Sequence, residues 1–341
     1  RAKGERLTRL LTLVNPVLAL SDANKDLTAI VYSGLMRKTS DGSFIPDLAE
    51  SYDVSSDGMT YTFILKKNAK FHDETPVSAD DIVFTIDKIK DSLIKSPRKI
   101  GWDGVEISKK DDTTVVFTLK QPFISFLDNT TIGILPMHIW KNVSVSEFSL
   151  SPLNIRAIGS GPYQIESVTK NSEGTPEVYN LKRFKNFVLG TPHIKNLNII
   201  SFSNEKDLIK DLLNNSIDQA SGLSPENAGD IKDSGYEIHT ATLPRIFGMF
   251  WNSSSNKVLG DKTVINAFNK AINRKEIVDK VLSGYGTIIQ NPIPETMSHD
   301  KANEIDAGSL EEASDILEKG GWKIGADGIR VSGGTKIITQ T

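Results

Sequence analysis

The chain has 341 residues, which is enough to bury a sizeable core and to form two or more domains. Lysine and arginine number 40 against 43 for aspartate and glutamate, a formal net charge of -3, so no basic excess points to nucleic acid or to an anionic membrane. Cysteine is absent, which excludes disulfides, thiolate metal sites and thiol catalysis, and no apolar window is long enough to span a bilayer.

The start of the chain predicts a strand, a polar loop and a helix. Its basic residues and leucines resemble a signal peptide, but no small-residue cleavage site follows them, so we interpret them as a first strand. The loop contains Leu20, Ser21 and Asp22, and the apolar positions between Leu27 and Leu35 fit one helical face. Ser21 or Asp22 can cap this helix, and contact with a ligand is the alternative role.

The next segment predicts a hairpin that leads into a helix. Asp41-Gly42 and Asp57-Gly58 are turn sequences, and residues 61–66 alternate so that one face of a strand is apolar and aromatic. Ser78, with Asp81 three residues later, is a helix-start pattern, and apolar residues then follow at helical spacing. A strand with one buried face therefore precedes a helix that faces the core.

The middle of the chain alternates strand and helix signals. Residues 105–119 predict two strands, and residues 195–213 predict a strand followed by a helix. Such alternation is typical of an α/β fold. Gly159 and Gly161 lie in a constrained turn, where nucleotide binding is excluded because Pro162 lacks a backbone donor and no third glycine follows.

The last part of the chain predicts further helices. Two helical faces between Val264 and Leu282 stop at Gly284, and a final helix begins at a capping box formed by Ser309 and Glu312. No motif of an enzyme accompanies these elements, since the sequence has no G-x-S-x-G, S-x-x-K or Walker A pattern and its five histidines lack metal-ligand spacing. We therefore predict no catalytic residue and no metal site.

Asp80 and Asp81 are the one pair of neighbouring carboxylates that suggests catalysis. They lie at the start of a predicted helix, where negative charge complements the helix dipole. We therefore expect a structural role for them.

The order of motifs resembles the peptide and nickel class of extracytoplasmic solute-binding proteins that serve ABC importers, bacterial solute-binding protein family 5. Members of that family have G-L-x-R, P-x-L-A-E-S, D-G-x-T-Y-T-F-x-L, F-H-D-G and A-D-D-V-x-F-T segments in this order. The corresponding segments here are residues 34–37, 46–51, 57–65, 71–74 and 79–85. The likeness continues to the last predicted helix, and residues 243–252 resemble a strand that leads into the family's third lobe.

Two departures from the family pattern fall at turns. Glu74 and Asn215 stand where family members usually have glycine. Asparagine tolerates the left-handed conformation better than most residues, so we expect the turn at Asn215 to survive. The geometry of the turn at Glu74 is left open.

The resemblance implies an α/β fold of the periplasmic-binding-protein-like type II class (cluster C), with mixed sheets and an extra small α/β second lobe. It places the first lobe in residues 1–45 and 156–252, the second in residues 46–155 and the third in residues 253–341. The family continues beyond the position that corresponds to Thr341. The resemblance therefore implies that the third lobe is incomplete and that the chain is C-terminally truncated.

A cleft between lobes is the ligand site that the resemblance implies. The residues expected to line it are Leu20, Ser21, Asp22, Trp102, Ser221, Gly222, Leu223, Arg245, Phe247 and Asn252. Arg245 can pair with a solute carboxylate or form a surface salt bridge. For Trp102 and Phe247, packing in the core is the alternative to ligand contact.

The implied function is the binding of a solute, an oligopeptide or dipeptide first of all, and its delivery to the permease subunits of an ABC transporter by hinged closure. The resemblance further implies a monomer without cofactor or nucleic acid that works outside the cytoplasm, in the periplasm or lipid-anchored at the cell surface. A nickel chelate or a sugar is the alternative solute. A ligand-sensing ectodomain or a peptide chaperone is the alternative function on the same fold.

Overall fold

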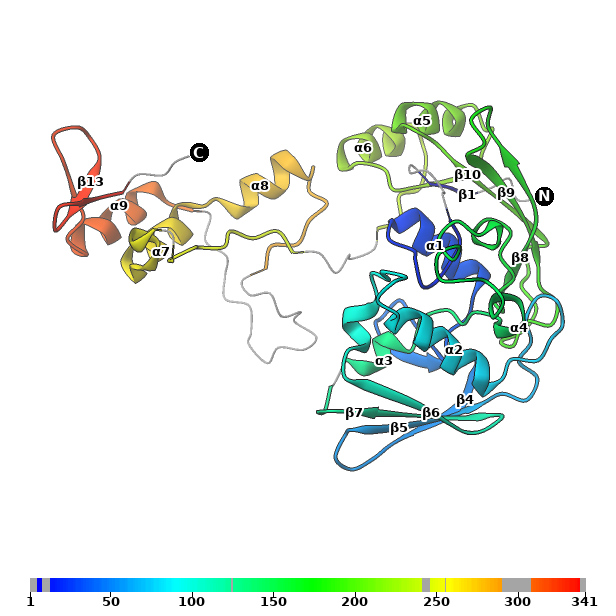
Figure 1. The fold of residues 1–341 in the computed structure, drawn as a ribbon. Coiled ribbons are helices and arrows are strands. Elements are labelled where there is room, and N and C mark those ends of the chain that lie inside the picture. The colour runs from blue at the N-terminus through cyan, green and yellow to red at the C-terminus, as the bar shows by residue number, and fades with distance from the viewer. Residues whose placement is uncertain are drawn as a thin grey trace. The chain divides into compact units, whose positions relative to one another are not determined.

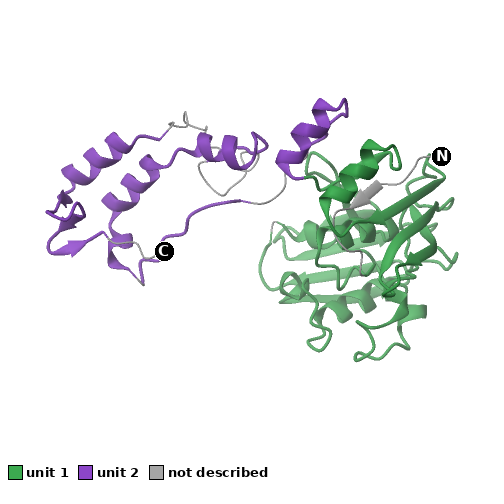
Figure 2. Cartoon of the chain, turned by 90° about the horizontal axis from the view of Figure 1, so that it is seen from above, with its two compact units in different colours: residues 1–223 green, residues 224–341 purple. Residues whose placement is uncertain are grey.

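The computed structural model describes residues 5–7, 13–123, 125–240, 246–254, 256–289 and 308–337. The chain divides into two compact units, residues 1–223 and 224–341 (Figure 2). This division precedes the boundary that sequence analysis placed after residue 252, and the expected lobe boundaries stay a prediction.

One layer of unit 1 is a mixed sheet with the strand order β11-β1-β10-β9-β8 (Figure 1). β1 pairs in parallel with β10 on one side and with β11 on the other, whereas β9 pairs antiparallel with both β10 and β8. The strands span Glu5–Leu7 (β1), Tyr163–Lys170 (β8), Pro176–Arg183 (β9), Asn196–Ser201 (β10) and Gln219–Ser221 (β11).

A second layer of unit 1 is an antiparallel sheet with the order β4-β5-β7-β6. Its strands span Ala49–Val54 (β4), Thr60–Leu65 (β5), Val105–Asp111 (β6) and Thr114–Leu119 (β7). The predicted hairpin and the two later strands are confirmed. In β5, Tyr61, Phe63 and Leu65 are buried while the side chains between them are partly or fully exposed, which is the pattern of a sheet with one solvated face. A separate hairpin joins β2 (Met36–Lys38) to β3 (Phe44–Pro46).

Helices α1 and α2 lie between these two layers in Figure 1. α1 contacts β8, and α2 contacts β6 and β7. The helices of unit 1 are α1 (Asp22–Val31), α2 (Ala79–Lys90), α3 (Phe126–Asn129), α4 (Met137–Trp140) and α5 (Glu205–Leu213), with short 3-10 turns at Lys99–Trp102 and Pro152–Asn154.

The start of α2 is set by the predicted pair of Ser78 and Asp81. Asp81 Oδ2 accepts hydrogen bonds from the backbone N–H and the hydroxyl of Ser78, both at 2.8 Å, so a capping box begins the helix. Asp81 Oδ1 also accepts from the backbone N–H of Met137 at 2.8 Å, which ties α4 to α2. Asp80 pairs with Lys109 at 2.7 Å. Both aspartates thus make the structural contacts expected of them.

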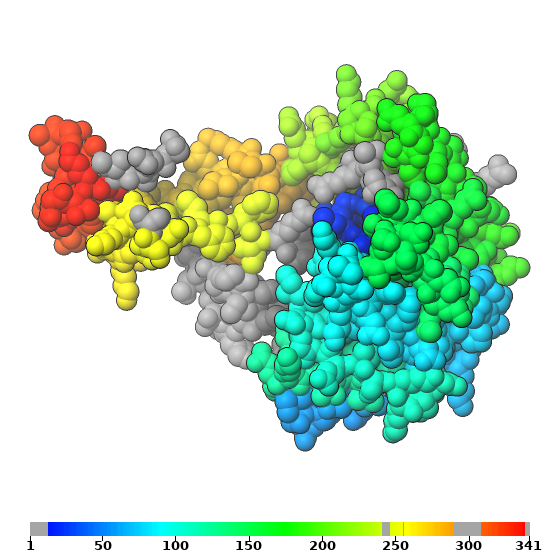
Figure 3. Space-filling model, viewed as in Figure 1, coloured from blue at the N-terminus to red at the C-terminus, as the bar shows by residue number. Residues whose placement is uncertain are grey.

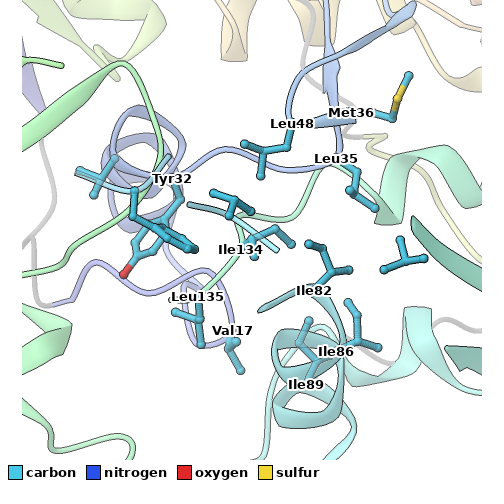
Figure 4. Close-up of a cluster of buried hydrophobic side chains, with 14 of the residues drawn as sticks. Val17, Tyr32, Leu35, Met36, Leu48, Ile82, Ile86, Ile89, Ile134 and Leu135 are labelled. Atoms are coloured by element: carbon cyan, nitrogen blue, oxygen red, sulfur yellow. The ribbon is translucent and has the colours of Figure 1, made fainter. Parts of the chain in front are cut away.

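A continuous apolar core fills the space between the layers of unit 1. In Figure 4, Ile82, Ile86 and Ile89 of α2 point toward Leu35 and Ile134. Deeper under the antiparallel sheet, aromatic rings pack edge to face or tilted against one another at centroid distances of 4.7 to 5.9 Å; these are Tyr61, Phe63, Trp102, Phe117 and Phe126. Such pairs add to the free energy of burial because the ring edges and faces are electrostatically complementary.

Glycines permit the backbone to cross itself tightly where the chain leaves α1. A Cβ at Gly159 would lie 2.1 Å from the carbonyl oxygen of Val31, one at Gly161 would lie 2.6 Å from the Val31 backbone, and one at Gly133 would lie 2.5 Å from the Cβ of Tyr32. Any side chain at these positions would force the segments apart. The crossing is closed by a hydrogen bond of 2.9 Å from Gly161 N–H to the Val31 carbonyl.

His72 holds this crossing from the other side. Its backbone N–H donates to the Gly159 carbonyl at 2.8 Å, its Nδ1 accepts from Gly159 N–H at 3.2 Å, and its Nε2 donates to the Gly161 carbonyl at 3.1 Å. The ring packs edge to face against Phe184 at 5.1 Å. Burial lowers the pKa of His72 to about 4, so the imidazole is neutral at pH 7 and its Nδ1 is free to accept.

Asn215 and Glu74, the two residues that replace a family glycine, both keep the turn, but in different ways. Asn215 has φ +54°, so the predicted left-handed turn is confirmed. Glu74 also adopts a positive φ of +69°, and its carboxylate contacts Lys70 at 3.0 Å and Asn186 Nδ2 at 2.9 Å. These contacts offset part of the cost of the left-handed backbone at a residue with a Cβ.

Unit 2 contains the helices predicted after residue 263 and one helix, over Pro225–Asp233, that was not predicted. Its elements are α6 (Pro225–Asp233), a 3-10 turn (Lys257–Gly260), α7 (Lys262–Ala271), α8 (Arg274–Val281), α9 (Leu310–Lys319) and the short strands β12 (Lys323–Ile324), β13 (Arg330–Ser332) and β14 (Thr335–Lys336). Val258, Val264 and Trp322 form a small core, and Trp322 Nε1 donates to Asp261 Oδ2 at 3.1 Å.

The prediction of a strand over residues 243–252 is wrong for the part that the structure describes. Residues 246–252 form no strand, because no described segment pairs with them, and residues 243–245 lie outside the described residues. Trp251 instead stacks on Phe268 of α7 at 5.2 Å.

Candidate functional site

The carboxyl ends of the parallel strands of unit 1 meet at one edge of the mixed sheet. The strand register aligns Leu7 of β1 with Ser201 of β10 and with Ser221 of β11. In open α/β sheets, ligands bind at the carboxyl ends of parallel strands. The predicted residues Ser221, Gly222 and Leu223 thus lie at the edge where a site is expected, and φ +73° at Gly222 turns the chain there.

Phe202 and Ser203, which neighbour this edge, were not among the predicted site residues. They follow β10 directly, and with Ser201 they line a depression of about 440 Å³ together with Glu177, Val178, Ile200, Asp207, Lys210 and Asp211. The predicted strand over residues 195–202 marked this position, but the pairing of β10 with β1 was needed to place it beside Ser221. The charged side chains around the depression make it a polar surface.

The loop that carries Leu20 is held by a pair of buried asparagines. Asn15 Nδ2 donates to Asn154 Oδ1 at 2.8 Å, and Asn15 Oδ1 accepts from Val17 N–H at 2.8 Å. Asn154 Nδ2 in turn donates to the Phe148 carbonyl at 2.8 Å. Because buried amides are costly unless they are paired, this arrangement specifies one conformation for the loop. The loop ends with the Leu20 side chain 69% exposed.

Ser21 and Asp22 begin α1. Ser21 Oγ accepts from Asn24 N–H at 3.2 Å, so the predicted capping role of Ser21 is confirmed. Asp22 lies in the first turn, 3.7 Å from Lys25 Nζ. Contact of either residue with a ligand stays a prediction.

Trp102 lies in the core of unit 1. Its side chain is 2% exposed and packs against Phe117 at 5.7 Å and Phe126 at 5.9 Å. Of the two roles considered for Trp102, the structure favours core packing. The loop before it is nevertheless tied to the Leu20 loop, because Ser96 Oγ donates to the Val17 carbonyl at 2.6 Å.

The remaining predicted residues belong to the second unit or its start. Arg245 lies outside the described residues. Phe247 is 85% exposed, so it does not pack into the core of the described part of unit 2. Asn252 is exposed, and its Oδ1 accepts from Ser254 N–H at 3.2 Å. Phe247 and Asn252 therefore lie on unit 2, whereas the other predicted residues with a described position lie on unit 1.

Metal and membrane features are absent from the part of the chain that the structure describes. No three of its histidine, aspartate or glutamate side chains cluster in a way that could hold a metal ion. His138 Nε2 lies 2.7 Å from Asp73 Oδ2, and His72 is engaged at the backbone crossing. Within the same residues, no helix is both long and apolar enough to cross a membrane.

The fold is of the predicted class, an α/β fold of the periplasmic-binding-protein-like type II. It combines the mixed sheet, the inserted antiparallel sheet and an edge at which parallel strands end together. Residues 43–341 match the model of the bacterial extracellular solute-binding proteins, family 5. The chain belongs to this family, as its motifs predicted.

Relatives and solved structures extend this finding over nearly the whole chain. The oligopeptide-binding protein AppA of Bacillus subtilis is 27% identical over 336 residues, which are 96% of this chain and 60% of AppA. The structure of AppA from Bacillus subtilis in complex with a nonapeptide is similar with a TM-score of 0.70 and 25% identity, over 98% of this chain and 68% of that one. NikZ of Campylobacter jejuni in complex with Ni(L-His) is similar with a TM-score of 0.72 and 25% identity, over 98% of this chain and 66% of that one.

Proposed function

We propose that the chain is the solute-binding component of an ABC importer and that its solute is a peptide. Membership of the solute-binding family carries the proposal, and likeness to an oligopeptide-binding relative and to its nonapeptide complex supports the choice of solute. The chain spans 60% of that relative's length, so the proposal concerns the whole protein. Its place of action is outside the cytoplasm, in the periplasm or on a lipid anchor, and it acts as a monomer without cofactor.

The proposed mechanism is closure around the solute followed by delivery to permease subunits. The residues proposed to contact the solute are those of the Leu20 loop and the Ser221–Leu223 turn, together with Arg245, Phe247 and Asn252. A solute that makes better contacts in the closed state than in the open one favours closure, because only differential contacts shift such an equilibrium. An extended peptide suits this use, since its backbone amides can pair with polar groups and its side chains can cover apolar ones.

Thermal unfolding in the presence of peptide pools tests the proposal. A ligand that binds only the folded state raises the unfolding temperature, so at least one pool of dipeptides to nonapeptides should raise it in a dose-dependent way. Isothermal titration with single peptides from that pool then gives the dissociation constant. Absence of any shift with every pool would reject a peptide as the solute.

A nickel chelate is the second candidate solute, because the NikZ structure with Ni(L-His) is similar over 98% of this chain. A metal chelate brings its own ligands, so it does not need a metal-binding cluster on the protein. The same thermal assay with nickel and histidine together, and with each alone, separates the candidates. A shift with the mixture and none with peptides would replace the peptide by the chelate.

A further inference from the structure

Two loops of unit 1 expose an unusual amount of apolar side chain. Within its described residues, the large apolar side chains with the highest exposed fractions are Leu20 at 69%, Leu93 at 75%, Leu150 at 84% and Ile100 at 89%, and the next is at 46%. Leu20, Leu93 and Ile100 lie on the two loops that the Ser96–Val17 hydrogen bond joins. On the face shown in Figure 3, the blue segment around α1 adjoins the cyan segment that follows α2.

The second of these loops also carries a cluster of positive charge. Lys95 and Arg98 are exposed and Lys99 is partly exposed, and none of them forms an ion pair with a described residue. Asp91, at the start of the loop, accepts the backbone N–H of Leu93 at 2.8 Å. Between Leu93 and Ile100 the sequence has no acidic residue, although the chain as a whole has a net charge of -3.

The loop is rigidly anchored beneath these exposed groups. Ile94 and Trp102 are 7% and 2% exposed, so the loop is anchored in the core at both of its ends. Ser96 Oγ accepts from Arg98 N–H at 3.2 Å, and Asn129 Nδ2 donates to the Gly101 carbonyl at 2.6 Å. A surface held in this way loses little conformational entropy when a partner binds.

Lys95 is in a backbone conformation that costs free energy. Its φ is +55°, in the left-handed region that residues with a Cβ seldom adopt. The anchors on either side impose this conformation, and such residues cluster at binding sites. The exposed aliphatic side chains, the cations without an ion pair to a described residue and the left-handed backbone of Lys95 therefore all lie on the two loops that the Ser96–Val17 hydrogen bond joins. We call their residues Leu20, Leu93, Lys95, Arg98, Lys99 and Ile100 the loop surface.

We infer that the loop surface binds an acidic peptide with aliphatic side chains. Its cations complement carboxylates, and its leucines and isoleucine can cover apolar groups, so the ligand needs both features. This inference rests on the proposed function and narrows the solute class from peptides in general to anionic ones. A purely polar peptide would leave the aliphatic groups uncovered, and a basic peptide would be repelled by the cations.

Binding of three tetrapeptides to the full protein tests the inference. One peptide alternates glutamate with leucine, the second has glutamine in place of glutamate, and the third has lysine. Isothermal titration at low salt should give the acidic peptide a dissociation constant about tenfold lower than that of the glutamine peptide. The lysine peptide should bind more weakly than both, and added salt should reduce the differences because exposed charges are screened.

Substitutions separate charge from apolar contact. Combining Lys95→Glu with Arg98→Glu should abolish the preference for the acidic peptide, whereas the matched control Lys141→Glu, at an exposed lysine outside the loop, should leave it unchanged. Combining Leu93→Ser with Ile100→Ser should weaken the acidic and glutamine peptides equally, by about tenfold. Circular dichroism checks that each variant keeps its fold.

Each result bears on a different claim. If none of the three peptides and no pool binds, the proposed function is wrong. If peptides bind but the acidic one is not preferred, or its preference survives the double charge reversal, the inference is wrong while the function stands. Binding to phosphatidylglycerol vesicles that depends on Lys95 and Arg98, without a peptide preference, would identify the loop surface as a membrane contact and also overturn the inference.

Discussion

Unit 1 and unit 2 differ in how much apolar side chain they bury. In unit 1, one core connects α1, α2 and both sheets, from Leu27 through Phe63 to Tyr179. In the described part of unit 2, the core consists of Val258, Val264 and Trp322 with their neighbours, and α8 buries none of its side chains. Because apolar burial is the main favourable term in folding, unit 1 should resist denaturant better than unit 2.

The difference also separates two kinds of exposed apolar surface. In unit 1, the exposed aliphatic side chains of the loop surface stand on a well-packed base. In unit 2, Phe247, Phe250 and Val281 are 85%, 93% and 70% exposed on elements with few buried neighbours. A rigid base favours selective binding, which is why we place the preference for acidic peptides on unit 1.

The strongest test of the comparison is Trp102→Ala against Trp322→Ala. Removing Trp102 leaves a cavity among Phe117 and Phe126, so the free energy of unfolding of unit 1 should fall by about 4 kcal/mol. Trp322→Ala should change only the weaker transition of unit 2. Urea unfolding followed by far-ultraviolet circular dichroism measures both. A single transition that shifts equally in the two variants would show that the units are not independent in stability.

The buried amide pair should give the next largest effect. Asn15→Ala removes one partner and leaves Asn154 Oδ1 buried without its donor, which should cost about 2 kcal/mol. The Leu20 loop loses its anchor, so peptide affinity should fall as well. Asn142→Ala, at an exposed asparagine, is a control of the same chemical change that does not touch the Asn15–Asn154 bond. Unchanged stability in Asn15→Ala would mean that the pair does not hold the loop.

Acid should weaken unit 1 through His72. Its folded-state pKa of about 4 is below the value near 6.5 of an unfolded histidine, so the unfolded state binds the proton first as the pH falls. The stabilisation is present above pH 6.5 and is lost as the pH falls toward 4, by roughly 2 kcal/mol between pH 7 and pH 5. His72→Gln, which keeps a donor but does not titrate, should flatten this slope. Equal slopes in both proteins would exclude His72 as the cause.

The smallest effect is expected at Glu74. Glu74→Ala keeps the left-handed backbone and loses the contacts to Lys70 and Asn186, so the variant should melt slightly below the wild type. Glu74→Gly loses the same contacts but relieves the backbone, so it should melt above the alanine variant and close to the wild type. Melting temperatures of the three proteins decide this. A glycine variant no more stable than the alanine variant would show that φ at this position carries no strain.

Local patterns predicted most elements of the fold. Ser78 and Asp81 determined where α2 begins, and Asp41-Gly42 and Asp57-Gly58 determined two hairpin turns. Ser309 is the N-cap of α9, and its side chain accepts a hydrogen bond from the backbone N–H of Glu312. These signals act through hydrogen bonds over a few residues, so one sequence contains them in full. The β8–β9 hairpin was missed, because the strand character of its residues depends on pairing with β10.

The candidate site divides in the same way. Patterns of neighbouring residues were enough to identify the family, to make Ser21 a candidate helix cap and to predict the turn at Asn215. The folded structure was needed to show that Trp102 is a core residue and that Ser201 and Ser221 share one sheet edge. It also showed that Ser96 joins the loop of Leu93 and Ile100 to that of Leu20. Those facts depend on contacts between segments far apart in the chain, where packing and strand register determine which side chains meet.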